Sequence, residues 1–185
     1  MNPPTSILTG KKILVVDDEK DILETIEDIL DDAEIDTAAD FDTAASKIEH
    51  NTYDLAILDI MGVNGLELLD ISVSKEIPTV MLTAHAVNPD SLMTSIRKGA
   101  MAYLPKETLS DLDTLLERLL SAHDRGEPPW KLVFEELDDY FNERFGPDWK
   151  KADQAFWTDF DRNYQVSRGI QERLLHNRKI LDKGI

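Results

Sequence analysis

The residues best suited to chemistry stand at the carboxyl ends of short apolar runs. One run ends in Asp17-Asp18, and a later one ends in Asp59. Thr83 closes a third run, and Lys106 follows a fourth closely. The runs are residues 12–17, 53–59, 78–83 and 101–104. Random placement would rarely put every such side chain at the end of an apolar segment, so we interpret them as one site.

These residue types together suggest phosphoryl chemistry. Three carboxylates brought together repel one another, so a divalent cation or a lysine must neutralise them. Mg²⁺ prefers hard oxygen ligands and shares its shell with phosphate oxygens and water. A carboxylate such as Asp59 can attack a phosphoryl group as a nucleophile. Lys106 would supply a fixed positive charge, and the Thr83 hydroxyl a short hydrogen-bond donor.

The segments around these residues predict five β–α units in series. The apolar runs, with a weaker one near residues 35–39, are typical of buried parallel strands. Between them, apolar residues recur at helical spacing. The helix that begins at Pro89 should end at Gly99, a usual left-handed stop. The expected helices are residues 22–30, 42–50, 64–74, 89–98 and 107–122. Such alternation predicts an α/β domain with helices on both faces of a parallel sheet, and a site at the carboxyl ends of the strands.

The order and spacing of Asp17-Asp18, Asp59, Thr83-Ala84, Tyr103 and Lys106 resemble the receiver domain of two-component response regulators. The resemblance covers about residues 11–123, and five motifs in register make it specific. It implies a flavodoxin-like (βα)5 fold with strand order 2-1-3-4-5. It also implies a chemotaxis-type signalling protein that catalyses only its own phosphorylation and dephosphorylation.

The resemblance further assigns a role to each site residue. Asp59 would take a phosphoryl group from a phosphohistidine on a histidine kinase or phosphotransfer protein. Asp18, Asp59 and the backbone carbonyl of Met61 would ligate Mg²⁺ directly, and Asp17 would act through water. Lys106 and Thr83 would contact the phosphoryl group.

The same resemblance predicts a conformational switch. Thr83 would turn inward to bond the phosphoryl oxygen, and Tyr103 would swing from exposed to buried. This would re-form a face for a downstream effector protein.

Two departures from the family pattern concern loops. The family commonly has Met-Pro after the acceptor and a glycine eight positions on, whereas here Gly65 comes six positions after Asp59. The family lysine is often followed by a proline in a cis bond, whereas here Pro105 precedes Lys106 and Glu107 follows it. Met61 and His85 flank the expected phosphoryl position, and neither readily activates water. We therefore expect slow loss of the phosphoryl group.

Charge and aromatic content divide the chain in two. The net charge is −17, and residues 1–125 carry 25 of the 37 acidic side chains but only 10 of the 20 basic ones. Ten of the thirteen aromatic residues lie in residues 126–185, after the helix-breaking stretch Arg125-Gly126-Glu127-Pro128-Pro129. We expect a flexible tail over residues 1–10, a receiver domain over 11–125 and a small all-α module over 126–185. A chain without cysteine, secretory signal or apolar span suggests a cytoplasmic protein without membrane insertion.

The C-terminal module has an aromatic stripe at Trp130, Phe134 and Phe141 that predicts a helix. Gly146-Pro147 should end it, with Pro147 beginning the next, and residues 170–181 suggest a last helix in a basic stretch. A packed helical bundle, a homodimerisation element and an effector-binding surface remain open. Nucleic acid is a disfavoured partner because the segment has a net charge of −2. Rival functions are a DNA-binding regulator with an unfamiliar helical output and a phosphatase with Asp59 as nucleophile.

Overall fold

The computed structural model describes residues 4–85 and 87–164. The chain forms two compact units, Met1–Glu117 and Arg118–Ile185. The expected last helix and the basic stretch near the C-terminus lie outside the described residues. Across the described parts of the chain, every helix is too short or too polar to cross a membrane.

The first unit is built on a five-stranded sheet. Its order is β2-β1-β3-β4-β5, and every neighbouring pair is parallel, as the sequence predicted. The four strands other than β2 are almost wholly buried, which explains their continuous apolar runs. The strands are β1 Lys12–Val16, β2 Glu34–Ala38, β3 Leu55–Leu58, β4 Thr79–Thr83 and β5 Ala102–Pro105.

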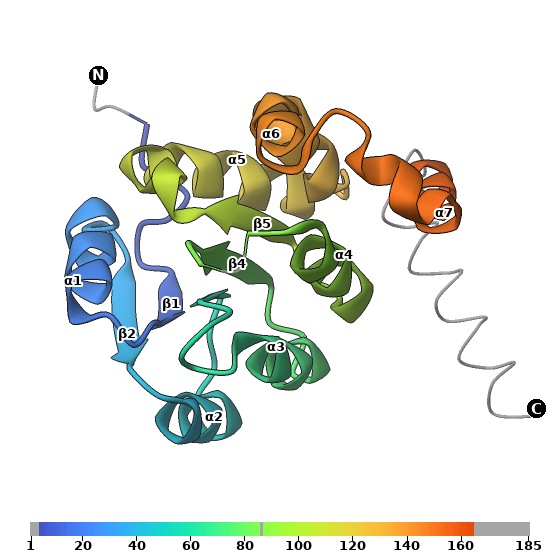
Figure 1. The fold of residues 1–185 in the computed structure, drawn as a ribbon. Coiled ribbons are helices and arrows are strands. Elements are labelled where there is room, and N and C mark those ends of the chain that lie inside the picture. Colours follow the sequence, from blue (N-terminus) through green and yellow to red (C-terminus); the bar gives the residue numbers. More distant parts are fainter. Residues whose placement is uncertain (1–3, 86, 165–185) are drawn as a thin grey trace, which may run out of the picture. The chain divides into compact units, whose positions relative to one another are not determined.

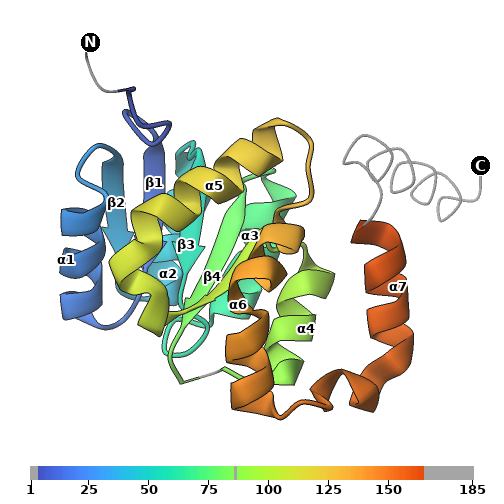
Figure 2. The same cartoon turned by 90° about the horizontal axis from the view of Figure 1, so that it is seen from above.

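Helices cover both faces of this sheet. Figure 1 shows α1 and the start of α5 on one side, and α2, α3 and α4 along the other. Figure 2 shows α1 beside β2 when the unit is viewed from above. The helices are α1 Lys20–Ile29, α2 Phe41–His50, α3 Gly65–Ser74, α4 Pro89–Lys98 and α5 Leu112–Asp124. This is the flavodoxin-like arrangement expected from the sequence.

Local signals explain where α4 begins and ends. The Asn88 side chain accepts a hydrogen bond from the Ser91 N–H, and Pro89 occupies the first turn. Gly99 closes the helix with φ 94°, the left-handed conformation that glycine adopts without strain. The sequence predicted both features.

Two segments of this unit differ from expectation. Residues 1–10 were expected to be a loose tail, but Leu8 is buried and the Ser6 hydroxyl donates to the Glu117 carboxylate. The Gly10 N–H also donates to the Asp32 carbonyl at 3.0 Å, so residues 6–10 are anchored to the domain. The last helix was expected from residue 107, but Lys106–Asp111 forms a 3-10 helix (η1) before α5 begins.

The second unit contains α6 Pro129–Phe145, a 3-10 helix (η2) at Trp149–Asp153 and α7 Gln154–Tyr164. The aromatic stripe lies on α6, as the sequence predicted. Trp130 and Phe141 are among the largest fully buried side chains, and Phe134 is half-buried. Edge-to-face ring contacts join α6 to α7, including Phe134 to Trp157 at 5.7 Å between centroids. Pro147 does not begin a helix, because the chain turns once more before η2 starts.

Candidate functional site

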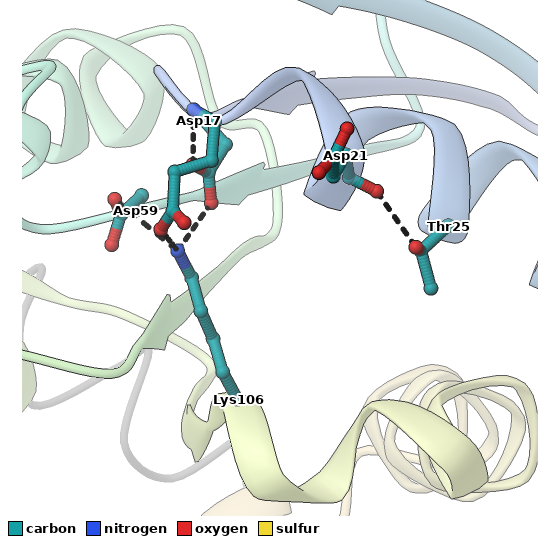
Figure 3. A network of polar contacts seen from close by, with 6 residues as sticks. Asp17, Asp21, Thr25, Asp59 and Lys106 are labelled. Atoms are coloured by element: carbon teal, nitrogen blue, oxygen red, sulfur yellow. Dashed lines mark hydrogen bonds and ion pairs between the residues drawn. The ribbon is translucent and has the colours of Figure 1, made fainter.

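The strand ends bring Asp17, Asp59 and Lys106 together. Val16 and Leu58 are register partners in β1 and β3, so Asp17 and Asp59 follow them side by side. The Asp59 N–H donates to the Val16 carbonyl at 2.9 Å, which extends the pairing to the acceptor position. Figure 3 shows Lys106 reaching across from the end of β5 toward both carboxylates, while Asp21 and Thr25 of α1 stand apart.

Lys106 is the cationic centre of this cluster. Its Nζ lies 2.7 Å from Asp17 Oδ2, 3.0 Å from Glu19 Oε1 and 3.6 Å from Asp59 Oδ2. Its side chain is only 8% exposed. Burial alone would lower the pKa of Lys106, but its bonds to Asp17 and Glu19 and the nearby Asp59 charge outweigh burial and raise it. The ammonium therefore stays charged inside the site.

Asp59 is a buried carboxyl whose charge is only partly compensated. It is 5% exposed. Burial, followed by repulsion from Asp17, raises the pKa of Asp59 to about 6, although Lys106 opposes the shift. The side chain is therefore ionised at neutral pH, as a nucleophile must be, while remaining poorly stabilised as an anion.

A second group of carboxylates lies beside Asp59 and Lys106 and is partly exposed to solvent. Asp17, Asp18 and Glu19 each offer a carboxylate oxygen within 4.8 Å of the others, and Asp18 and Glu19 are exposed. Hard oxygen donors with room for water are the donor set that Mg²⁺ prefers, so these residues fit the cation. The sequence had placed Asp59 in the direct ligand set and had not included Glu19. In the described structure, Asp59 is linked to the group through Lys106.

The two expected switch residues are both buried. Thr83, the last residue of β4, is completely inaccessible, and so is Tyr103 in β5. The Tyr103 hydroxyl lies 2.7 Å from the Ser91 hydroxyl of α4. The structure thus shows the inward position of Tyr103, held to α4. The expected movement between two positions stays a prediction.

The loop after the acceptor is a tight turn. The Gly65 N–H donates to the Ile60 carbonyl at 3.0 Å, and Gly62 and Asn64 have positive φ angles. A Cβ on Gly65 would lie 1.8 Å from the Asp59 carbonyl oxygen, so only glycine fits there. Met61 projects outward and is 53% exposed. The turn therefore packs the start of α3 against the backbone of the acceptor. The described residues contain no cis peptide bond.

Sequence reasoning missed two contributors. Glu19 directly follows Asp17-Asp18 in the sequence. This position next to the acidic pair was the one sequence feature that could have indicated its contact with Lys106. That contact is the main reason the pKa of Glu19 is lowered. Ser91 gave no signal, because only the fold brings the first turn of α4 against β5.

Comparison with known proteins agrees with this fold. The chain belongs to the family with a response regulator receiver domain, whose family model matches residues 13–120. Regulatory protein VanRB of Enterococcus faecalis is 41% identical over 78 residues, which is 40% of this chain and 36% of that protein. Response regulator ArlR of Staphylococcus saprophyticus is 33% identical over 127 residues, which is 66% of this chain and 56% of that protein. The chain thus spans about half the length of the curated relatives it matches, or less.

Solved structures show the same architecture. A CheY-like receiver domain protein from Methanospirillum hungatei JF-1 aligns with a TM-score of 0.56 at 29% identity, covering 64% of this chain and all of that one. NtrX from Brucella abortus aligns with a TM-score of 0.55 at 36% identity, covering 62% of this chain and 27% of that one. The likeness is to receiver domains, alone or within longer regulators.

Proposed function

We propose that this chain is a two-component response regulator in which Asp59 accepts a phosphoryl group in a Mg²⁺-dependent reaction. The donor is a phosphohistidine on a histidine kinase or a phosphotransfer protein, encountered in the cytoplasm. The observation that supports the proposal best is the position of Lys106, whose Nζ lies within 4 Å of Asp17, Glu19 and Asp59. A buried cation beside one weakly stabilised carboxylate suits transfer of an anionic group.

The transfer needs one bond to form and one to break. An Asp59 carboxylate oxygen attacks the phosphorus, the P–N bond to the donor histidine breaks, and the imidazole leaves and recovers a proton from solvent. Lys106 offsets charge on the phosphoryl oxygens, and the Thr83 hydroxyl donates to one of them. Bound Mg²⁺ would be held by Asp18, Asp59, the Met61 carbonyl and, through water, Asp17, and it would supply further positive charge, with Glu19 beside it.

The proposed output is a change of the surface near α4 and β5. Thr83 is the last residue of β4, and its register partner Pro105 lies two residues after Tyr103. Tyr103 in turn contacts Ser91 on α4. A movement of Thr83 toward the phosphoryl group therefore has a short route to α4, where a downstream protein partner can sense it.

Intact mass measurement tests the proposal. The full chain is incubated with phosphoramidate, with Mg²⁺ or with EDTA. We expect the gain of one phosphoryl group only with Mg²⁺, lost again on treatment with hydroxylamine, and no gain in Asp59→Asn. Asp54→Asn, which changes a carboxylate before β3 rather than after it, is the matched control and should be phosphorylated normally. Absence of a labile adduct in the unaltered chain would refute the proposal.

A DNA-binding output is a second candidate, because one relative is named Transcriptional regulatory protein TcrA of Mycobacterium tuberculosis. Against it, residues 126–185 carry twelve acidic and ten basic side chains, and DNA binding needs a basic surface. We therefore favour a protein-binding or homodimerising role for this part. Light scattering with and without beryllofluoride distinguishes dimerisation, and a gel shift at physiological salt tests DNA binding.

A further inference from the structure

In the turn between β3 and α3, two buried residues flank two exposed ones. Ile60 and Val63 are buried and fix the turn to the domain. Met61 and Gly62 lie between them and are exposed. The outward part of the turn therefore stands at the surface beside the acidic group, with its backbone held in place from both sides.

Gly62 lies directly against the Asp18 carboxylate. A Cβ on Gly62 would lie 2.4 Å from Asp18 Oδ2, 2.5 Å from Cγ and 2.7 Å from Oδ1. These separations are far below van der Waals contact, so the carboxylate occupies the space that any side chain at position 62 would need. The contact joins the loop after the acceptor to the loop after β1.

The constraint at Gly62 differs from the one at Gly65. A side chain at Gly65 would meet the backbone carbonyl of Asp59, which cannot move without disturbing the strand end. The three atoms nearest to a Cβ at Gly62 all belong to the carboxylate of the exposed Asp18 side chain, which can rotate toward solvent. Substitution at Gly62 should therefore leave the fold intact and displace the carboxylate.

We infer that Gly62 is a positioning residue for the cation site. Its missing side chain allows the Asp18 carboxylate to stand over the turn, within reach of Asp17 and Glu19. The inference rests on the proposed function, in which Asp18 is a direct Mg²⁺ ligand. It predicts that cation affinity depends on a residue that offers no side-chain ligand.

Calorimetric titration of the full chain with Mg²⁺ tests this role without requiring phosphorylation. Gly62→Ala should bind Mg²⁺ about 10-fold or more weakly, the loss typical when a ligand's positioning contact is removed. Gly10→Ala is the matched control. Gly10 also has a positive φ, 71° against 80° for Gly62, but a Cβ there meets nothing within 4 Å. It should carry similar backbone strain and bind Mg²⁺ normally.

A second variant covers the case in which alanine at position 62 prevents folding. Gly62→Asn also adds a Cβ, but asparagine tolerates positive φ, as Asn64 does in the same turn. It should fold, as judged by thermal unfolding, and lose Mg²⁺ affinity to the same extent.

A double-mutant cycle shows whether the effect passes through Asp18. Asp18→Ala should weaken binding, and adding Gly62→Ala to it should cause no further loss. Wild-type affinity in folded Gly62→Ala or Gly62→Asn, or an undiminished further loss in the Asp18→Ala background, overturns the inference while leaving the proposed function intact. Failure of the unaltered chain to bind Mg²⁺ overturns both.

Discussion

Replacing Asp59 by asparagine should stabilise the Mg²⁺-free protein more at neutral pH than in acid. The pKa of Asp59 is raised from 3.8 to about 6 because the carboxyl is buried and faces Asp17. For an acid whose folded pKa is raised, the folded state binds more protons than the unfolded state between these values. Stability therefore falls as pH rises through this window.

The size of the effect follows from the two pKa values. At about pH 7.5 the ionised carboxyl lowers the free energy of unfolding by about 3 kcal/mol, and at about pH 4.5 by about 1 kcal/mol. The amide that replaces the carboxyl in Asp59→Asn carries no such charge at either pH. The difference in unfolding free energy between Asp59→Asn and the unaltered chain should therefore grow by about 2 kcal/mol over this range, in favour of the variant.

Urea unfolding followed by far-UV circular dichroism, in EDTA and at both pH values, measures this difference. Because the second unit is the same in both chains, its contribution cancels. Asp28→Asn, an exposed carboxyl on α1, controls for the general loss of one negative charge. A difference between Asp59→Asn and the unaltered chain that does not change with pH would refute the reasoning. So would a variant that is less stable at neutral pH.

Three further predictions concern other parts of the molecule. The Nζ of Lys150 lies 4.9 Å, 5.3 Å and 5.2 Å from the ring centroids of Phe134, Trp149 and Trp157, and its side chain is 42% exposed. Lys150→Met should therefore destabilise the second unit by about 1 kcal/mol, measured by urea unfolding followed by tryptophan fluorescence. Lys131 is more exposed, and Lys131→Met should not destabilise the unit; equal effects of the two substitutions would contradict the cation–π account. Ser91→Ala and Tyr103→Phe should each lower the free energy of unfolding by about 1 kcal/mol. The double variant should lose less than their sum, because the two hydroxyls share one buried hydrogen bond, although Ser91→Ala also removes the bond from its hydroxyl to the Asn88 carbonyl; additive losses would contradict this coupling. Met61→Asn should speed loss of the phosphoryl group by about tenfold, the equivalent of one hydrogen bond to the attacking water, while Met61→Leu should not. An unchanged decay rate for Met61→Asn would contradict the expectation that Met61 slows hydrolysis because it cannot orient this water.

The sequence was sufficient to predict where Asp17, Asp59 and Lys106 meet. Parallel strands place their carboxyl ends at one edge, and each of these residues follows an apolar run whose length and pattern are typical of a buried strand. The strand order was predicted from the family resemblance. Hydrophobic periodicity alone does not show which strands are neighbours in the sheet.

Other features depend on side-chain geometry that a sequence pattern does not carry. Lys106 contacts Asp17 more closely than Asp59, and Glu19 shares it, because the lysine side chain crosses the site to satisfy several carboxylates. The position of Leu8 in the core depends on a surface assembled from distant segments. In the second unit, the aromatic stripe predicted α6, but the placement of Lys150 among three rings arises only when η2 and α7 fold back on that helix.

The most direct test of the central claim is a crystal structure of the chain with Mg²⁺ and beryllofluoride. The account predicts beryllium bonded to an Asp59 carboxylate oxygen, with Lys106 Nζ and the Thr83 hydroxyl contacting fluorine and the metal ion beside Asp18. Beryllofluoride bound at another residue, or a metal ion that leaves Asp18 without contact, would contradict it.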